Sequence, residues 1–280
     1  MTYLVLAVLV QVTMASLLKI GELYRQDRLV VMGFNYLAAT VVTVAAWAVQ
    51  GSGVPGTATL VLGTVAGVFY AMGLFVWMGA IATVGLGTST AALRLSVLWP
   101  TFLSLLVFGE RPAPAQLTGV ALTFGVLGLL AAHSLRVQRA RPGQGGLGWV
   151  LATFTINGGA GVCQKLFTEL APPVEKMALL ALIFATATLV TGAPMLKGRR
   201  RLRRGDVVRG LAFGLGNVCS NTFLLMGLER VAGAVAFPFA SVGTILLTSL
   251  SGIVLWRERP GLLGSAAIAL AAVSVVLMLR

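Results

Sequence analysis

ALRLSVLWPTFLSLLVFGERP, residues 92–112, and ASVGTILLTSLSGIVLWRERP, residues 240–260, end in the same tripeptide, 148 positions apart. Each stretch is a long apolar run closed by Glu-Arg-Pro, whose proline ends a helix. About 20 helical residues, at a rise of about 1.5 Å each, cross the hydrocarbon core of a bilayer. Both stretches therefore predict a membrane-spanning helix that ends in a tight turn, with local ion pairs between the charges of that turn.

The offset of 148 residues extends beyond these two stretches. It aligns identical residues without a gap at further positions: Phe75 with Phe223, Met78 with Met226, Gly79 with Gly227, Gly85 with Gly233, and Ala121 with Ala269. Apolar segments share Leu and Ala by chance, so the repeated Glu-Arg-Pro carries most of the weight. The chain is predicted to be a duplication, with related halves at residues 1–140 and residues 141–280.

The composition indicates a membrane protein. Of the 280 residues, 58% are hydrophobic and 10% are charged, and the mean hydropathy is +0.93. A soluble domain needs more polar surface than this. Apolar segments of spanning length fall at about residues 2–20, 29–49, 58–81, 85–108, 115–133, 146–166, 176–196, 207–228, 231–255 and 262–279. The predicted fold is an all-α integral membrane protein with ten transmembrane helices.

Each predicted half crosses the bilayer an odd number of times. The second half must therefore run in the opposite direction to the first, which makes the chain two inverted five-helix repeats. Secondary transporters use this arrangement and bind their substrate near the midplane, between the halves. Two inverted copies can exchange conformations, so that a central site opens to each side of the membrane in turn.

The chain resembles the drug/metabolite transporter superfamily and, within it, the EamA-type ten-helix transporters. The resemblance covers the five-plus-five arrangement, the FLLMGL motif at residues 223–228, and the Glu-Arg-Pro turns, which are similar to an acidic turn of the family. It implies that the protein transports a small molecule. Family members move amino acids, metabolites, nucleotide sugars or drugs, so the resemblance does not name the substrate.

The basic residues predict an orientation. There are 21 Lys and Arg against 8 Asp and Glu, and alternate assignment of the loops gives 15 basic residues to one side and 5 to the other. The positive-inside rule then places both termini outside the cytoplasm, in a multi-pass protein of the cell (inner) membrane. The resemblance implies cytoplasmic termini, so the two predictions disagree. Much of the bias comes from the loop at residues 197–209, which is predicted to contact anionic lipid.

Several other classes of function are disfavoured. No basic stretch carries the interleaved aromatic residues that stack on bases, so nucleic-acid binding is not expected. Cys163 and Cys219 lack ligand spacing, and we expect no metal, cofactor or disulfide. One histidine and scattered acidic residues give no acid–base cluster, so an enzyme is not expected. The alternatives left open are a non-transporting membrane protein that binds lipid or a partner and, less favoured, a membrane-embedded enzyme. A monomer or a homodimer is expected.

Arg94 is the main candidate for binding a substrate. It lies nine residues into the fourth segment, about 13 Å deep by helix rise. Burying an arginine there costs about 2.5–3.5 kcal/mol on insertion scales, which implies a wet cavity or a bound anion. Thr101 and Ser104 follow on roughly the same helix face. The alternative is that the side chain of Arg94 extends to the cytoplasmic headgroups.

Acidic residues are absent from the interior of the predicted segments. All eight fall at helix ends or in loops: Glu22, Asp27, Glu110, Glu169, Glu175, Asp206, Glu229 and Glu258. Proton-coupled carriers commonly use a buried carboxylate. The sequence therefore favours uniport, exchange, or coupling through another group.

An offset of 146 residues pairs further polar residues of the two halves. It aligns Gln11 with Asn157, both deep in the membrane, and Lys19 with Lys165, both near helix ends. These four side chains are predicted to face a central cavity. For the amides the alternative is an interhelical hydrogen bond, and for the lysines it is a helix end that reaches the headgroups.

Polar and aromatic stripes on three segments complete the predicted site. The eighth segment carries Asn217, Ser220 and Asn221 at helical spacing, the ninth carries Ser241, Thr244, Thr248 and Ser251, and the third carries Tyr70 and Trp77. Polar stripes turn toward protein or water, while the two aromatic residues are alternatively anchors at the membrane interface. The sequence predicts a secondary transporter that moves a small anionic or amphiphilic metabolite by alternating access, with substrate between segments 1, 3, 4, 6, 8 and 9.

Prolines and glycines predict features of helix packing. Pro100 and Pro238 interrupt the hydrogen bonding of the fourth and ninth segments and are candidate hinges, although structural kinks explain them equally well. GTVAG at residues 63–67 and GLAFG at residues 210–214 place two glycines one helical turn apart. This spacing allows a neighbouring helix to approach closely.

Overall fold

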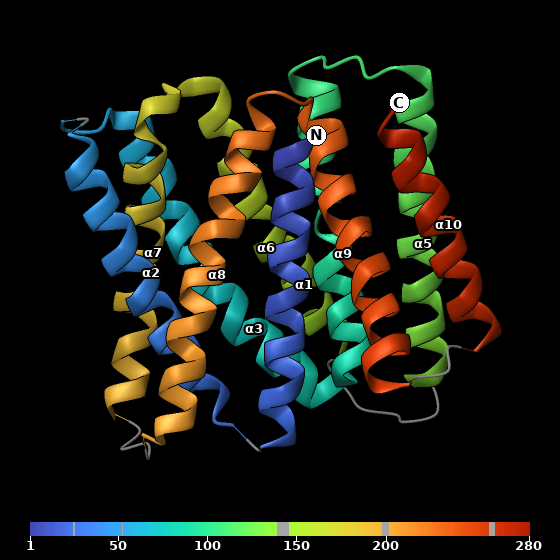
Figure 1. Ribbon diagram of the computed structural model, residues 1–280, viewed down its shortest axis with the longest axis horizontal. Helices are drawn as coiled ribbons and strands as arrows, with labels where there is room; N and C mark the ends of the chain where they lie inside the picture. Colours follow the sequence, from blue (N-terminus) through green and yellow to red (C-terminus); the bar gives the residue numbers. More distant parts are fainter. Residues whose placement is uncertain (25, 52, 139–145, 198–201, 258–260) are drawn as a thin grey trace.

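The computed structural model describes residues 1–24, 26–51, 53–138, 146–197, 202–257 and 261–280. Within these ranges the chain is helical and has no strand (Figure 1). The elements are α1 (Thr2–Leu23), α2 (Arg28–Gln50), α3 (Thr57–Leu95), α4 (Leu98–Phe102), η1 (Leu103–Val107), α5 (Pro114–Gln138), α6 (Gly146–Leu170), η2 (Pro173–Glu175), α7 (Lys176–Lys197), α8 (Arg204–Leu228), α9 (Gly233–Trp256) and α10 (Leu262–Met278).

These helices have the length and composition of membrane-spanning segments. In the described ranges, nine helical segments are long and apolar enough to cross a bilayer, and α10 is a shorter apolar helix. The predicted all-α, ten-helix membrane fold is confirmed.

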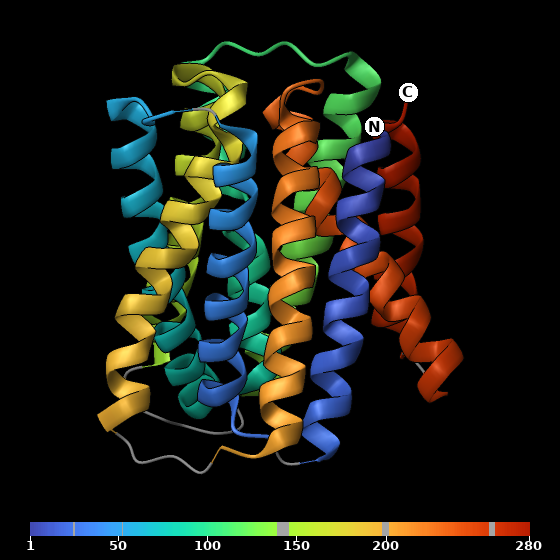
Figure 2. The same cartoon turned by 60° about the vertical axis from the view of Figure 1, so that its left-hand side comes forward.

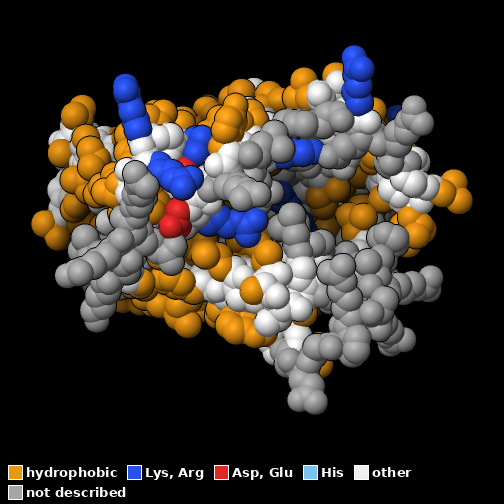
Figure 3. Space-filling view, turned by 90° about the horizontal axis from the view of Figure 1, so that it is seen from below, with side chains coloured by type: hydrophobic (Ala, Val, Ile, Leu, Met, Phe, Trp, Pro, Cys, Tyr) orange, Lys and Arg blue, Asp and Glu red, His pale blue; other side chains and the backbone are white. Residues whose placement is uncertain are grey.

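The helices form a bundle whose two ends differ. Both chain termini lie at one end, which we call the terminus face (Figures 1 and 2). At the opposite end α1 leads into α2, and α7 is followed by α8. Basic side chains gather there, and we call it the basic face (Figure 3). Its described basic residues, partly or fully exposed, are Lys19, Arg28, Arg203, Arg204, Arg209 and Arg257. In the predicted lipid-binding loop, residues 198–201 lie outside the described ranges.

The contacts between helices come in matching sets. α1 packs against α8, and α6 packs against α3; α2 packs against α7, and α5 packs against α10. In Figure 1, α2 runs toward the terminus face, whereas α7, five crossings later, runs away from it. Each main contact of a helix in one half therefore has a counterpart made by the corresponding helix of the other half.

The third and fourth crossings differ from the predicted segments at residues 58–81 and 85–108. Helix α3 continues to Leu95 and is broken inside by Gly85, whose φ of 77° and ψ of 165° are accessible to glycine without strain. The third crossing thus passes into the fourth without a separate loop. The remainder of the fourth crossing is divided into α4 and the π-helical turn η1, a form often found at functional sites.

The predicted close packing at the glycine pairs is confirmed. A Cβ atom on Gly67 would lie 2.6 Å from the carbonyl oxygen of Ile183 in α7, and one on Gly214 would lie 2.6 Å from that of Asn35 in α2. Cβ atoms are not found so close to a backbone oxygen. Helix α3 therefore approaches α7, and α8 approaches α2, at distances that only glycine allows.

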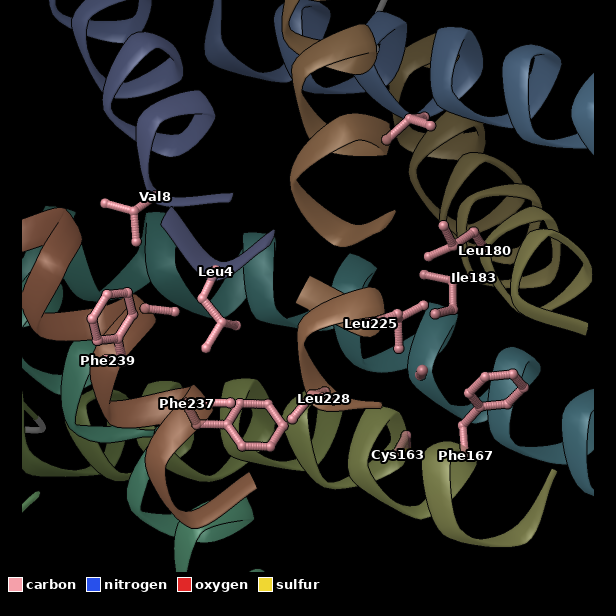
Figure 4. Close-up of a cluster of buried hydrophobic side chains, with 14 of the residues drawn as sticks. Leu4, Val8, Cys163, Phe167, Leu180, Ile183, Leu225, Leu228, Phe237 and Phe239 are labelled. Carbon is pink, nitrogen blue, oxygen red and sulfur yellow. The ribbon is translucent and has the colours of Figure 1, made fainter. Parts of the chain in front are cut away.

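The hydrophobic core extends toward the terminus face. Figure 4 shows buried side chains from the early turns of α1, α7 and α9 and from the late turns of α6 and α8. They include Leu4, Val8, Cys163, Phe167, Leu180, Ile183, Leu225, Leu228, Phe237 and Phe239. Because these turns all lie toward the terminus face, apolar side chains fill that half of the bundle between the central helices.

Candidate substrate-binding site

A cavity of about 400 Å³ lies between α1, α2, α3, α4, α6, α8 and α9. Gln11, Asn157 and Asn217 line it near the middles of their helices, so the cavity lies about halfway between the two faces. Its volume is within the usual range for small-molecule sites, about 300–1,000 Å³. This is the position in which transporters of inverted repeats bind their substrates.

The structure brings most of the predicted site residues together. Seven of them line the cavity: Gln11, Tyr70, Trp77, Arg94, Asn157, Asn217 and Ser241. Asn221 and Thr244 lie one layer behind, each in hydrogen bonds to a lining residue. Lys19 and Lys165 do not line the cavity. Of the two predicted hinges, Pro100 lines it beside Gly161, whereas Pro238 is buried within α9.

Arg94 is the cation of this cavity. Its side chain is partly exposed, and no described residue forms a hydrogen bond or an ion pair with it. Thr101 and Ser104, predicted to share its helix face, are buried and do not line the cavity. An unpaired guanidinium group in a membrane-embedded cavity favours an anionic group beside it.

Other hydrogen-bond donors in the cavity also lack acceptors. Trp77 Nε1 and Ser241 Oγ are buried and have no partner among the described residues. The Oε1 atom of Gln11 accepts a hydrogen bond of 2.9 Å from the Thr244 hydroxyl, and no described acceptor takes the amide nitrogen of Gln11. Buried polar groups are almost always hydrogen-bonded. The cavity therefore offers a surplus of donors, which an oxygen-rich anion satisfies.

A hydrogen-bonded network of polar side chains forms one wall. Asn217 donates to Asn35 at 3.2 Å, and Asn221 donates to Asn217 at 2.8 Å. Tyr70 and Gln164 both donate to the Oδ1 atom of Asn221, at 2.6 and 2.7 Å. These five residues come from α2, α3, α6 and α8. They satisfy one another and fix the relative positions of four helices around the cavity.

Tyr70→Phe is expected to lower the free energy of unfolding by about 1–3 kcal/mol. The substitution removes the hydroxyl that donates to Asn221 Oδ1, so that this buried oxygen keeps only the hydrogen bond from Gln164. Thermal unfolding in detergent measures the loss. Tyr3→Phe is the matched control, since Tyr3 packs its ring against Phe223 and its hydroxyl has no hydrogen-bond partner among the described residues. An equal loss in both variants contradicts the network's role.

Several lining residues were not predicted. Asn35 and Gln164 are amides within predicted segments, Gln164 close to the end of its segment, and an amide inside an apolar segment was the signal that could have identified them. Tyr36 donates its hydroxyl to the carbonyl of Tyr70 at 3.1 Å. The apolar lining residues include Met14, Met32, Phe213 and Phe237. They carry no such signal, because lipid-facing and cavity-facing apolar residues are of the same types.

The two ends of the cavity differ in exposure. Toward the basic face, Met14, Trp77, Arg94 and Phe213 are partly exposed. Toward the terminus face, the lining residues Gln164 and Phe237 are 4% and 5% exposed, and every residue of α9 from 233 to 244 is buried. The cavity is therefore closed at its terminus end by the packed side chains of α6 and α9, whereas its lining toward the basic face mixes partly exposed residues with the buried Met32 and Asn35.

The first Glu-Arg-Pro turn differs from the prediction of local ion pairs. The carboxylate of Glu110 accepts hydrogen bonds from the backbone nitrogens of Gly233 and Ala234, at 3.1 and 2.8 Å, and pairs with Lys165 at 2.5 Å. These partners lie 55 to 124 residues away in the sequence. Burial raises the pKa of Glu110, but its three donors outweigh burial and hold the pKa below its ordinary value. The second turn, residues 258–260, lies outside the described residues.

The fold agrees with comparisons to known proteins. Residues 144–280 match the sequence profile described as the EamA-like transporter family. This half of the chain is therefore similar to the EamA-like transporter family. The resemblance predicted from the FLLMGL motif and the repeated turns is thereby confirmed over residues 144–280, and the chain is a multi-pass membrane protein.

Two further proteins are similar to this chain over both halves. A protein of Haemophilus influenzae (strain ATCC 51907 / DSM 11121 / KW20 / Rd), described as uncharacterized, is 27% identical over 268 residues, which cover 91% of this chain and 90% of that protein. A protein of known crystal structure superposes with a TM-score of 0.75 at 17% identity, over 99% of this chain and 95% of the other. The second comparison shows that the ten-helix fold is shared.

Proposed function

We propose that this protein is a secondary transporter that moves a small anionic or amphiphilic metabolite across the cell membrane by alternating access. The observation that carries the proposal is Arg94, a cation without a counter-charge among the described residues, at a cavity midway between the two faces. The unpaired donors of Trp77 and Ser241 line the same cavity. A carboxylate or phosphate group is the kind of acceptor that these donors require, and the aromatic and methionine side chains of the lining suit an apolar part of the solute.

The arrangement of the halves supports alternating access. Thr40 and Thr188, which are 148 residues apart, approach each other with their hydroxyl oxygens 2.9 Å apart. Thr123 and Ser274, 151 residues apart, do likewise at 2.7 Å. Thr40 and Thr188 are equivalent under the offset of 148 residues, and equivalent residues meet where two related halves pack around a two-fold axis. Thr123 and Ser274 join α5 to α10, the last crossings of the two halves. Because α2 and α7 run in opposite directions (Figure 1), that axis lies in the membrane plane, as inverted repeats require.

Orientation follows from the charge distribution. Arg203, Arg204 and Arg257 are exposed on the basic face, and the positive-inside rule places this face in the cytoplasm. On this proposal, the described conformation is the state with the cavity accessible from the cytoplasm and closed on the other side. Transport requires that the halves rock so that the packed end opens and the basic end closes.

Exchange of radiolabelled solutes in proteoliposomes tests the proposal. A thermal-shift screen of purified protein first selects ligands from carboxylates and phosphate monoesters, each matched with its neutral amide or alcohol. We expect an anionic member to stabilise the protein and to exchange across the vesicle membrane, while its neutral counterpart does neither. Equal responses to the charged and neutral members, or exchange of no anion that binds, contradict the proposal.

A further inference from the structure

A buried ion pair lies at the closed end of the bundle. The Lys165 ammonium group, with its side chain 2% exposed, contacts Glu110 at 2.5 Å, and Glu110 is 16% exposed. Breaking a buried ion pair is strongly destabilising when it leaves either charge without another partner. This pair is therefore a firm connection between the two segments that carry it.

The carboxylate of Glu110 connects three crossings. Glu110 follows η1 at the end of the fourth crossing, Lys165 belongs to α6, and the nitrogens of Gly233 and Ala234 begin α9. Both nitrogens are at a helix N-terminus, where the helix dipole also attracts a negative charge. One side chain thus holds α6 and the start of α9 to the end of the fourth crossing.

These connections are adjacent to the cavity. Gln164, next to Lys165, lines the cavity and donates to Asn221. Phe237, one turn after Ala234, lines it from α9. Since α4, α6 and α9 all contribute to the cavity wall, their terminus ends cannot separate while Glu110 keeps its partners.

Lys165 has a second carboxylate partner, so its ion pair with Glu110 can separate without leaving the lysine uncompensated. Lys165 also contacts Glu169 at 2.5 Å, one turn along the same helix, and Glu169 is 37% exposed. When α6 moves away from Glu110, Lys165 keeps this counter-charge. Glu110 lies in a turn at the terminus face, where water replaces its lost donors. Neither charge is left bare in the apolar interior, so opening avoids most of the usual cost of breaking a buried pair.

We infer that Glu110 and Lys165 form the gate that closes the cavity toward the terminus face and that they separate once in each transport cycle. This assignment rests on the proposed function, because it gives the pair a role in alternating access. It also gives Lys165 a place in the cycle other than contact with substrate. By contrast, Lys176 and Glu229, paired at 2.6 Å at the same end, join α7 to α8 and leave the fourth crossing and α9 untouched.

Accessibility of a single cysteine tests the gate without a known substrate. The reporter is Ala240→Cys, a cavity-lining residue that is 7% exposed, in a Cys163→Ala, Cys219→Ala background. A membrane-impermeant maleimide is applied from each face in turn, to intact cells and to inverted vesicles. We expect Glu110→Gln and Lys165→Met each to raise the labelling rate from the terminus face about tenfold, within the usual range of conformational coupling. Glu229→Gln, the matched control, leaves the rate unchanged.

Gel filtration and thermal unfolding show whether each variant is folded. If Glu110→Gln does not fold, Lys165→Met provides the test. An unchanged rate from the terminus face in the folded variants overturns the gate, as does an equal rise in Glu229→Gln. The two proposals fail separately. If the reporter opens as expected but no anion exchanges in the parent protein, the gate stands as a conformational element and the transport proposal is wrong.

Discussion

Replacing Arg94 with methionine is expected to weaken binding of the transported anion by about 10- to 100-fold. The substitution keeps a flexible apolar side chain about as long as the arginine stem and removes the one described cation of the cavity lining. A hydrogen bond to a charged group contributes about 1.5–3 kcal/mol, and each 1.4 kcal/mol is a factor of ten in affinity. Arg94→Lys is expected to retain part of the affinity, because lysine keeps the charge but lacks the planar fork of donors.

The dissociation constant from thermal-shift titration and the half-saturating concentration for exchange both measure this effect. Arg203→Met is the matched control, because Arg203 is exposed on the basic face and far in sequence from the cavity residues of α8. The control is expected to bind as the parent does. Undiminished affinity in Arg94→Met, or an equal loss in Arg203→Met, removes Arg94 from the mechanism.

Gly67→Ala and Gly214→Ala are each expected to lower the free energy of unfolding by about 1–3 kcal/mol, the range for overpacking in a tight interior. The added Cβ at Gly67 would meet the backbone of Ile183 and the side chain of Thr186, and that at Gly214 would meet Asn35 and Ala38. Backbone atoms cannot yield as a flexible side chain can, so the helices must move apart. The double variant is expected to lose approximately the sum.

Thermal unfolding in detergent, followed by circular dichroism, measures this loss. Gly125→Ala in α5 is the control, because a Cβ there meets nothing within 4 Å. Alanine is favoured over glycine in a helix by roughly 0.5–1 kcal/mol, so this control is expected to be neutral or slightly stabilising. Equal melting temperatures for Gly67→Ala and Gly125→Ala would show that the close contact between α3 and α7 does not limit stability.

The sequence by itself determined which segments cross the membrane and much of what faces the cavity. Residues such as Gln11, Arg94 and Asn157 were identifiable because a polar group in the hydrocarbon region needs protein or water beside it. The glycine pairs were identifiable for a similar local reason, since two small residues one turn apart permit close approach whatever the partner. In each case a property of one helix was sufficient.

The tertiary structure alone decided which distant groups meet. The sequence suggested that Lys165 faces a cavity and that Glu110 pairs locally, yet the two contact each other at the closed end, and Glu110 also holds the start of α9. Likewise, the turn at Gly85 and the contact of Asn35 with Asn217 depend on how neighbouring crossings pack. Hydropathy and spacing fix which face of a helix avoids lipid, but the partner of a buried charge is set by the packing of helices far apart in the chain.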